Sequence, residues 1–305
     1  LVLDYGTAES LEIIRAHGED IAAVLVEPVQ SRRPDFQPRE FLRSLRRLTR
    51  ELGAVYVFDE VVTGFRAHPR GAQGLFGIQA DLATYGKVVG GGFPIGVIAG
   101  ASEFMDALDG GAWQFGDDSM PMVGVTYFAG TFVRHPLALA AAKAVLVHLR
   151  TQGGRLQEDL GARTSAMVSE INAFCAQVGA PLEVRQFASV WKTHFLEDHP
   201  LQDLLFAMMR SRGVHILNNF PCFLSTAHGD ADIERIVQAF KDVLGSVTQI
   251  ISEFHTSDAE KLEAQRKLVE IERNFNLEVM KLDQQWAQSQ ADVIKTEATS
   301  ESWLT

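Results

Sequence analysis

The residues best suited to chemistry are an acid and a lysine. Asp59 lies in the apolar run AVYVFDEVV (54–62), and Lys87 lies in DLATYGKVVGGGFPIG (81–96), just before Gly90–Gly92. An acid at the carboxyl end of a buried strand lies where open α/β sheets bind ligands, and its burial requires a cationic partner. A lysine in apolar surroundings loses its proton more readily, and neighbouring glycines allow unusual backbone angles and close approach. Together these residues predict a ligand site.

Two cationic partners would suit Asp59. One is Mg²⁺ on a nucleotide, since apolar residues before Asp-Glu also form a Walker B pattern. That hypothesis requires GxxxxGK[ST] upstream of the acid, but Gly86-Lys87 follows it, with Asp81 and Val88 at the glycine and hydroxyl positions. The other is the ring nitrogen of pyridoxal phosphate (PLP), whose sites combine a lysine Schiff base with an acid. PLP explains Lys87 better, and a Walker-type NTPase stays the alternative.

Strands and helices must position these residues. Continuous apolar runs occupy 21–29, 54–62 and 93–101. An arginine-bearing helix over 38–51, closed by Gly53, separates the first two runs. Such runs are typical of parallel strands buried on both faces, so the sequence predicts an α/β domain. A further helix is expected over 135–150, with Pro136 at its start.

The chain is expected to have three parts. Residues 1–145 form part of a large α/β domain, 146–250 a small α+β domain, and 251–305 an amphipathic helical tail or linker. In the tail, apolar residues recur every three or four positions from Ala264 to Trp286. The pattern favours a docking or linker helix over a coiled-coil dimerisation helix.

Composition argues against several classes of partner. The chain has 305 residues and a formal net charge of −11, which disfavours nucleic acid as a partner. No apolar run reaches the roughly 18 residues of a membrane helix. Cys175 and Cys222 are widely separated, which suits a reducing compartment. We therefore expect a cytoplasmic protein without nucleic-acid or membrane partners, and we predict no metal site.

Five segments, in order, resemble the class III PLP-dependent aminotransferases, a family that includes the glutamate-1-semialdehyde aminomutases. They are VLVEPVQ (24–30), YVFDEVVTGFR (56–66), ADLATYGKVVGGGFPIG (80–96), AGTFVRHPLALAAA (129–142) and GVHILNNFPCFLSTAHGDADIERIVQAF (213–240). The resemblance covers roughly residues 1–250. It implies an aspartate-aminotransferase-like fold, PLP-dependent fold type I, whose N-terminal part has no counterpart in this sequence.

The resemblance also implies roles for individual residues. Lys87 would form the Schiff base with PLP and move the proton between substrate and cofactor, while Asp59 would keep the ring nitrogen protonated. Val61 would press on one ring face. Thr131 would donate its hydroxyl to the cofactor phosphate of the neighbouring subunit, which implies a homodimer with shared active sites. Two further residues would lie near the cofactor, outside the set that touches it: Glu27 and Gln30.

The implied activity is transfer of an amino group from an amino-acid donor to a keto acceptor. FPCFLSTAHGDADIE (220–234) resembles aminotransferase domains of hybrid polyketide and peptide synthetases, which implies a β-keto acyl acceptor on a carrier domain. A glutamate-1-semialdehyde-type aminomutase is an alternative, although the late glutamate of that enzyme is not matched at Pro221 and Cys222. A non-catalytic dimerisation or docking remnant is another, because the family's phosphate cup has no counterpart here.

Overall fold

The computed structural model describes residues 1–108, 116–120, 130, 133–197 and 202–253, with scattered positions between 266 and 296. The chain divides into two compact units. One comprises Leu1–Val168, Val184–Lys192 and Pro221–Ala227; the other comprises Ser169–Glu183, Thr193–Phe220 and His228–Thr305. All the predicted site residues that the structure describes belong to the first unit. The three-part division at 145 and 250 stays a prediction.

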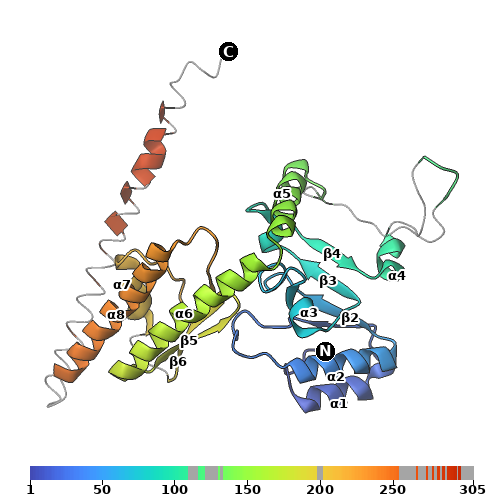
Figure 1. The fold of residues 1–305 in the computed structure, drawn as a ribbon, viewed down its shortest axis with the longest axis horizontal. Coiled ribbons are helices and arrows are strands. Elements are labelled where there is room, and N and C mark those ends of the chain that lie inside the picture. Colours follow the sequence, from blue (N-terminus) through green and yellow to red (C-terminus); the bar gives the residue numbers. More distant parts are fainter. Residues whose placement is uncertain are drawn as a thin grey trace. The chain divides into compact units, whose positions relative to one another are not determined.

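A four-stranded sheet of order β1-β2-β3-β4 forms the centre of the first unit (Figure 1). The strands are β1 (Ala23–Val26), β2 (Val55–Asp59), β3 (Leu82–Tyr85) and β4 (Val97–Gly100). The first three are parallel, whereas β4 runs antiparallel to β3. The predicted parallel arrangement thus holds for the runs 21–29 and 54–62 and is wrong for 93–101, and β3 was not among the predicted runs. The link between β3 and β4, residues 86–96, contains the 3-10 turn η2 and no α-helix, whereas a parallel return is usually made through a crossover helix.

The outer strands of this sheet are less covered than the sequence predicted. Leu25 on β1 is 66% exposed and Ile98 on β4 is 50% exposed. Both strands lie at sheet edges, so each has a neighbouring strand on one side only. The expectation of burial on both faces is therefore wrong for β1 and β4 in this chain.

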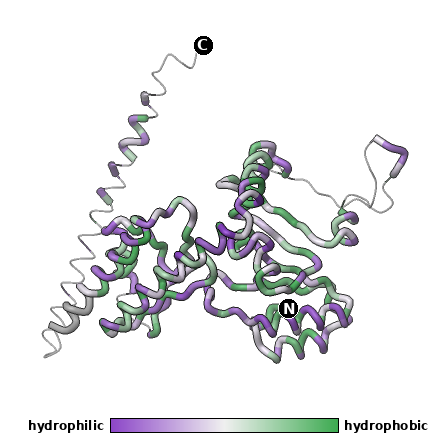
Figure 2. Tube along the Cα trace, viewed as in Figure 1, coloured by the Kyte–Doolittle hydropathy of each residue, from purple (hydrophilic) through white to green (hydrophobic). Residues whose placement is uncertain are grey.

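Two helices lie side by side in the first unit, α1 (Ala8–Ala16) and α2 (Arg39–Leu52) (Figure 1). Along both helices, hydrophobic and hydrophilic stretches alternate (Figure 2). The apolar side of α2 is buried at Leu42, Leu45 and Leu48. Helix α2 ends as predicted at Gly53, whose φ of 69° is left-handed and whose N–H donates to the carbonyl of Thr49.

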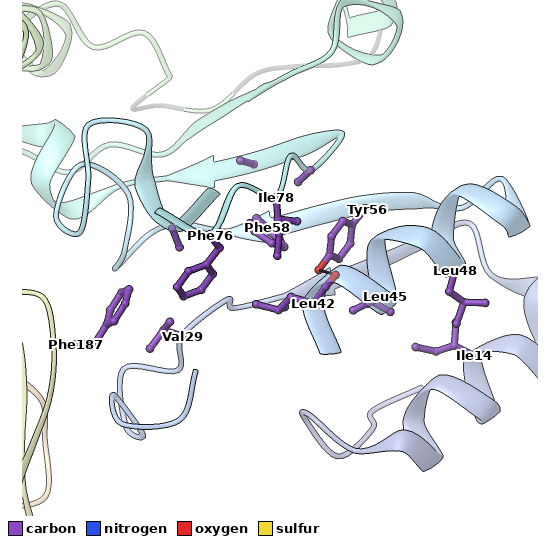
Figure 3. Packing of buried hydrophobic residues seen from close by; sticks show 13 residues of the cluster. Ile14, Val29, Leu42, Leu45, Leu48, Tyr56, Phe58, Phe76, Ile78 and Phe187 are labelled. Carbon is purple, nitrogen blue, oxygen red and sulfur yellow. Dashed lines mark hydrogen bonds between the residues drawn. The ribbon is translucent and has the colours of Figure 1, made fainter. Parts of the chain in front are cut away.

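The core of the first unit forms around β2 (Figure 3). Tyr56 and Phe58 are fully buried, with ring centroids 4.9 Å apart, and the Tyr56 hydroxyl donates to the Leu42 carbonyl at 3.3 Å. Because side chains alternate along a strand, Asp59 lies on the opposite face from these two rings. One face of β2 thus supplies the core, and the other is left to the acid.

The remaining elements include the helix expected over 135–150, which is α5. They are α3 (Gly71–Phe76), α4 (Ser102–Met105), α5 (Pro136–Gln152), α6 (Arg155–Val178), α7 (Gln202–Ser211), α8 (Asp230–Glu253), η1 (Gly18–Asp20), η2 (Lys87–Gly90), η3 (Asp106–Leu108), β5 (Leu182–Phe187), β6 (Val190–Phe195) and β7 (Cys222–Phe223). The second sheet has the order β5-β6-β7. Described positions between 266 and 296 are helical, while the apolar positions of the predicted tail helix lie outside the described residues. Within the described part of the chain, no helix combines the length and apolar character needed to cross a bilayer.

Within the glycine run after Lys87, Gly91 packs against α5. Gly91 and Gly92 have φ of 57° and 94°, which confirms the expected unusual backbone angles. A Cβ on Gly91 would lie 2.8 Å from Val145 Cγ2 of α5, whereas one on Gly92 would meet nothing within 4 Å. The sequence predicted close approach at these glycines as part of a ligand site, whereas the close neighbour of Gly91 is a helix.

Gly91→Ala is therefore expected to lower the melting temperature more than Gly92→Ala. Both changes place a side chain at positive φ, which costs about 1 kcal/mol, and only the first adds an overlap with α5. Thermal unfolding of both variants measures the difference. Val145→Ala combined with Gly91→Ala should recover part of the loss, and equal losses in the two single variants would contradict the packing argument.

Candidate active site

Three predicted site residues meet at one edge of the sheet. Glu27 directly follows β1, Asp59 ends β2, and Lys87 follows β3 after Gly86. Since β1, β2 and β3 are parallel, their carboxyl ends share this edge. The electrostatics agree, because the charges of Asp59 and Lys87 both act on the Glu27 carboxyl. The structure thus brings together an acid pair and an amine from separate segments.

The contacts of Asp59 leave one carboxylate oxygen available. Its Oδ1 accepts the backbone N–H of Val61 at 3.0 Å and the Thr84 hydroxyl at 3.3 Å. Among the described residues, these bonds hold the carboxylate in place without engaging Oδ2. An anchored carboxylate with an accepting oxygen suits a protonated ring nitrogen, so this residue fits PLP.

Val61 lies beside the backbone that leads into Lys87. A Cβ on Gly86 would lie 3.4 Å from Val61 Cγ1 and 3.3 Å from the Ile95 carbonyl oxygen. Gly86 is buried, so the segment after β2 contacts the segment after β3 at this point. This contact keeps Val61 at the same edge as Asp59 and Lys87, and its contact with a cofactor ring stays a prediction.

Lys87 begins η2 in a strained backbone conformation. Its φ is 47°, in the left-handed region that non-glycine residues rarely adopt. Strain of this kind costs on the order of 1–3 kcal/mol and is concentrated at functional sites. The residue is exposed in this chain, whereas the sequence led us to expect apolar surroundings. The buried neighbours Val89 and Gly90 lie on the inner side of η2, which explains why the flanking sequence is apolar.

Glu27 and Gln30 line a groove of about 780 Å³ beside β1. Burial raises the pKa of the Glu27 carboxyl above its usual range; the Ser31 N–H lowers it, the charge of Asp59 raises it, and Lys87 lowers it. The Ser31 N–H donates to Glu27 Oε1 at 3.0 Å. Glu27 is therefore within electrostatic reach of both predicted residues, and Gln30 lies in the adjoining turn. Thr131 lies outside the described residues.

Glu60 was not identified as a site residue from the sequence. It is 0% exposed, and its carboxylate accepts the Thr63 hydroxyl, the Ala72 N–H at 2.9 Å and the Gln73 N–H at 3.0 Å. Burial raises its pKa, while these donors lower it. Its burial could have been predicted from the sequence. Side chains alternate along a strand, so Glu60 is expected on the same buried face as Tyr56 and Phe58.

The two cysteines lie in surroundings that disfavour the thiolate. Burial raises the pKa of Cys222 to about 12 and that of Cys175 to about 11. Since the thiolate is the reactive form, both should react with Ellman's reagent at pH 8 at least about tenfold more slowly than in urea-unfolded protein. A fast reaction of either thiol in the folded protein would show that it is more accessible and more acidic than this.

Comparisons with known proteins show the family of the chain. The family model described as Aminotransferase class-III matches residues 5–271. A glutamate-1-semialdehyde 2,1-aminomutase of Nitratidesulfovibrio vulgaris is 35% identical over 248 residues, 76% of this chain and 55% of that protein. Another, of Desulfitobacterium hafniense, is 34% identical over 264 residues, 81% of this chain and 58% of that protein. The chain therefore spans little more than half the length of these relatives.

Solved structures show the same fold. A beta-phenylalanine aminotransferase from Variovorax paradoxus has a TM-score of 0.69 and 32% identity, covering 81% of this chain and 57% of that one. A transaminase with PLP bound has a TM-score of 0.70 and 26% identity, covering 82% and 58%. The described chain thus has part of the PLP-dependent fold-type-I architecture, which confirms the predicted fold class.

Proposed function

Because the chain belongs to the class-III aminotransferase family, we propose that it forms part of a PLP-dependent enzyme that moves an amino group from an amino-acid donor to a keto acceptor. The supporting observation is the convergence of Asp59 and Lys87 at the carboxyl edge of three parallel strands. In the proposed site Asp59 would bind the PLP ring nitrogen, so its position needs no magnesium-bound nucleotide, and we do not propose a Walker-type NTPase.

Each residue has a distinct part in the proposed site. Bound PLP supplies an electron sink for negative charge at the substrate carbon. Asp59 Oδ2 would hold the proton on the ring nitrogen, and its bonds to Val61 N–H and Thr84 keep the carboxylate oriented. The Lys87 amine would attach the cofactor and then carry a proton to and from the substrate carbon. Val61 would limit the movement of the ring.

Lys87→Ala is expected to abolish covalent attachment of PLP in the natural polypeptide that carries this sequence. Borohydride reduction followed by peptide mass spectrometry should find the cofactor on Lys87 in the unaltered protein and on no lysine in the variant. Lys143→Ala, which removes an exposed lysine of α5, is the matched control and should retain the label. A label on another lysine would exclude the proposed role. No PLP binding at all would favour the non-catalytic remnant.

An internal amino-group transfer is the second candidate function. It is favoured by the relatives named glutamate-1-semialdehyde 2,1-aminomutase at 34–35% identity. Incubation with glutamate-1-semialdehyde alone distinguishes the two, because an aminomutase needs no second amino donor, whereas an aminotransferase turns over only with donor and acceptor together. A carrier-bound β-keto acyl acceptor, suggested by residues 220–234, is tested by comparing free and carrier-attached acceptors in the same assay.

The surface of α5 supports a homodimer with shared sites. Four large apolar side chains on this helix are exposed: Leu137 (55%), Leu139 (48%), Val147 (44%) and Leu146 (40%). A helix that is apolar nearly all round is normally covered by protein. A second copy is the proposed occupant, since α5 begins five residues after Thr131, the residue proposed to reach the neighbouring subunit's cofactor phosphate.

Mixed dimers test this arrangement. Thr131→Ala and Lys87→Ala proteins should each have little activity, and refolding them together should restore activity because a heterodimer contains one site with both residues intact. The measurement is the transamination rate against the mixing ratio. Absence of complementation, in mixtures shown to contain heterodimers, would contradict cross-subunit phosphate binding.

A further inference from the structure

We propose that Glu60 is a positioning residue, which holds Asp59 and Lys87 in register at the candidate site. The inference rests on the proposed function and adds a residue outside the predicted PLP contacts. Glu60 is fully buried, and its backbone N–H donates to the Thr84 carbonyl at 2.9 Å. Thr84 in turn donates its hydroxyl to Asp59 Oδ1. The residue next to Asp59 is thus tied to the strand that leads to Lys87.

The Glu60 carboxylate is the centre around which the chain folds after β2. It accepts hydrogen bonds from residues 3, 12 and 13 positions later in the chain, Thr63, Ala72 and Gln73. Gly71, with φ of 63°, lies directly against it, since a Cβ there would be 2.5 Å from both carboxylate oxygens. No larger residue fits at position 71 while the carboxylate occupies this place. The carboxylate therefore holds the two ends of the segment 60–73 together.

The segment 60–73 contacts β3 at Tyr85, the residue before Gly86 and Lys87. Gln73, whose N–H donates to Glu60, also donates its side-chain amide to the Tyr85 hydroxyl at 3.2 Å. A Cβ on Gly64 would lie 2.6 Å from the Tyr85 ring. Two parts of the segment therefore pack against Tyr85, and displacement of the segment would move the start of η2.

The choice of an acid at position 60 supports this role over a general contribution to the core. A buried carboxylate costs more than an apolar side chain of similar size, and only several hydrogen bonds compensate for that cost. A carboxylate can accept all three donors, whereas a glutamine amide has one accepting oxygen and one donor group. Glu60→Gln therefore preserves the shape while breaking part of the network.

The test compares Glu60→Gln with Ile14→Ala, a core change on α1 that is distant in sequence from residues 59–87. Glu60→Gln should weaken PLP binding by about tenfold, the effect of losing one hydrogen bond to a charged acceptor. In cofactor-free protein it should speed hydrogen exchange in peptides covering 60–64 and 86–90. Ile14→Ala should lower the melting temperature while leaving PLP affinity and both peptides unchanged.

Gly71→Ala and Gly77→Ala form a second, independent pair. Both glycines have φ near 65°, but a Cβ on Gly77 would meet nothing within 4 Å. Only Gly71→Ala should reproduce the loss of PLP affinity and the faster exchange at 86–90. If Glu60→Gln leaves both PLP affinity and hydrogen exchange unchanged, the positioning role of Glu60 is overturned and the proposed function is not. Failure of the unaltered protein to bind PLP would overturn the proposed function, while the exchange measurements would still report whether Glu60 links the two segments.

Discussion

The parallel register of β1, β2 and β3 is the constraint on which the candidate site depends. Val26 pairs with Phe58, and Asp59 pairs with Thr84, so each strand ends within one or two residues of its neighbour. The residues that follow these strands therefore reach the same edge. A slip of one residue would turn Asp59 towards the core and turn the rings of Tyr56 and Phe58 away from it. Core packing thus fixes the position of the acid.

The same alternation gives the adjacent acids Asp59 and Glu60 different environments. Asp59 lies on the face opposite the core and keeps one oxygen available among the described contacts. Glu60 continues the buried face and accepts three donors from the segment that follows it. One acid is therefore open to a ligand, and the other organises the protein around it. The alternation of side chains along the strand is enough to place the two acids on opposite faces of the sheet.

Local signals predicted a large part of this arrangement. Apolar runs located β1 and β2, Gly53 marked the end of α2, and Asp59 and Lys87, which the sequence predicted at one site, lie at the same edge of the sheet. The direction of β4, the exposure of Lys87 and the neighbour of Gly91 depend on where distant segments pack, so local patterns could not supply them. The burial of Glu60 follows from the strand alternation, but two of its donors, Ala72 and Gln73, become its neighbours only when α3 packs against it.

The charge at the strand edge favours a cationic ligand group. Burial and the charge of Asp59 both raise the pKa of the Glu27 carboxyl, and Lys87 acts in the opposite direction. A raised carboxyl pKa means that folding stability falls as pH rises from the ordinary pKa through the raised value, because the ionised form is disfavoured in the folded protein. A protonated ring nitrogen at Asp59 would oppose this effect by placing positive charge beside both acids. Burial is the larger cause of the raised Glu27 pKa and the charge of Asp59 the smaller, so a cation at this edge would offset part of the cost of ionising Glu27.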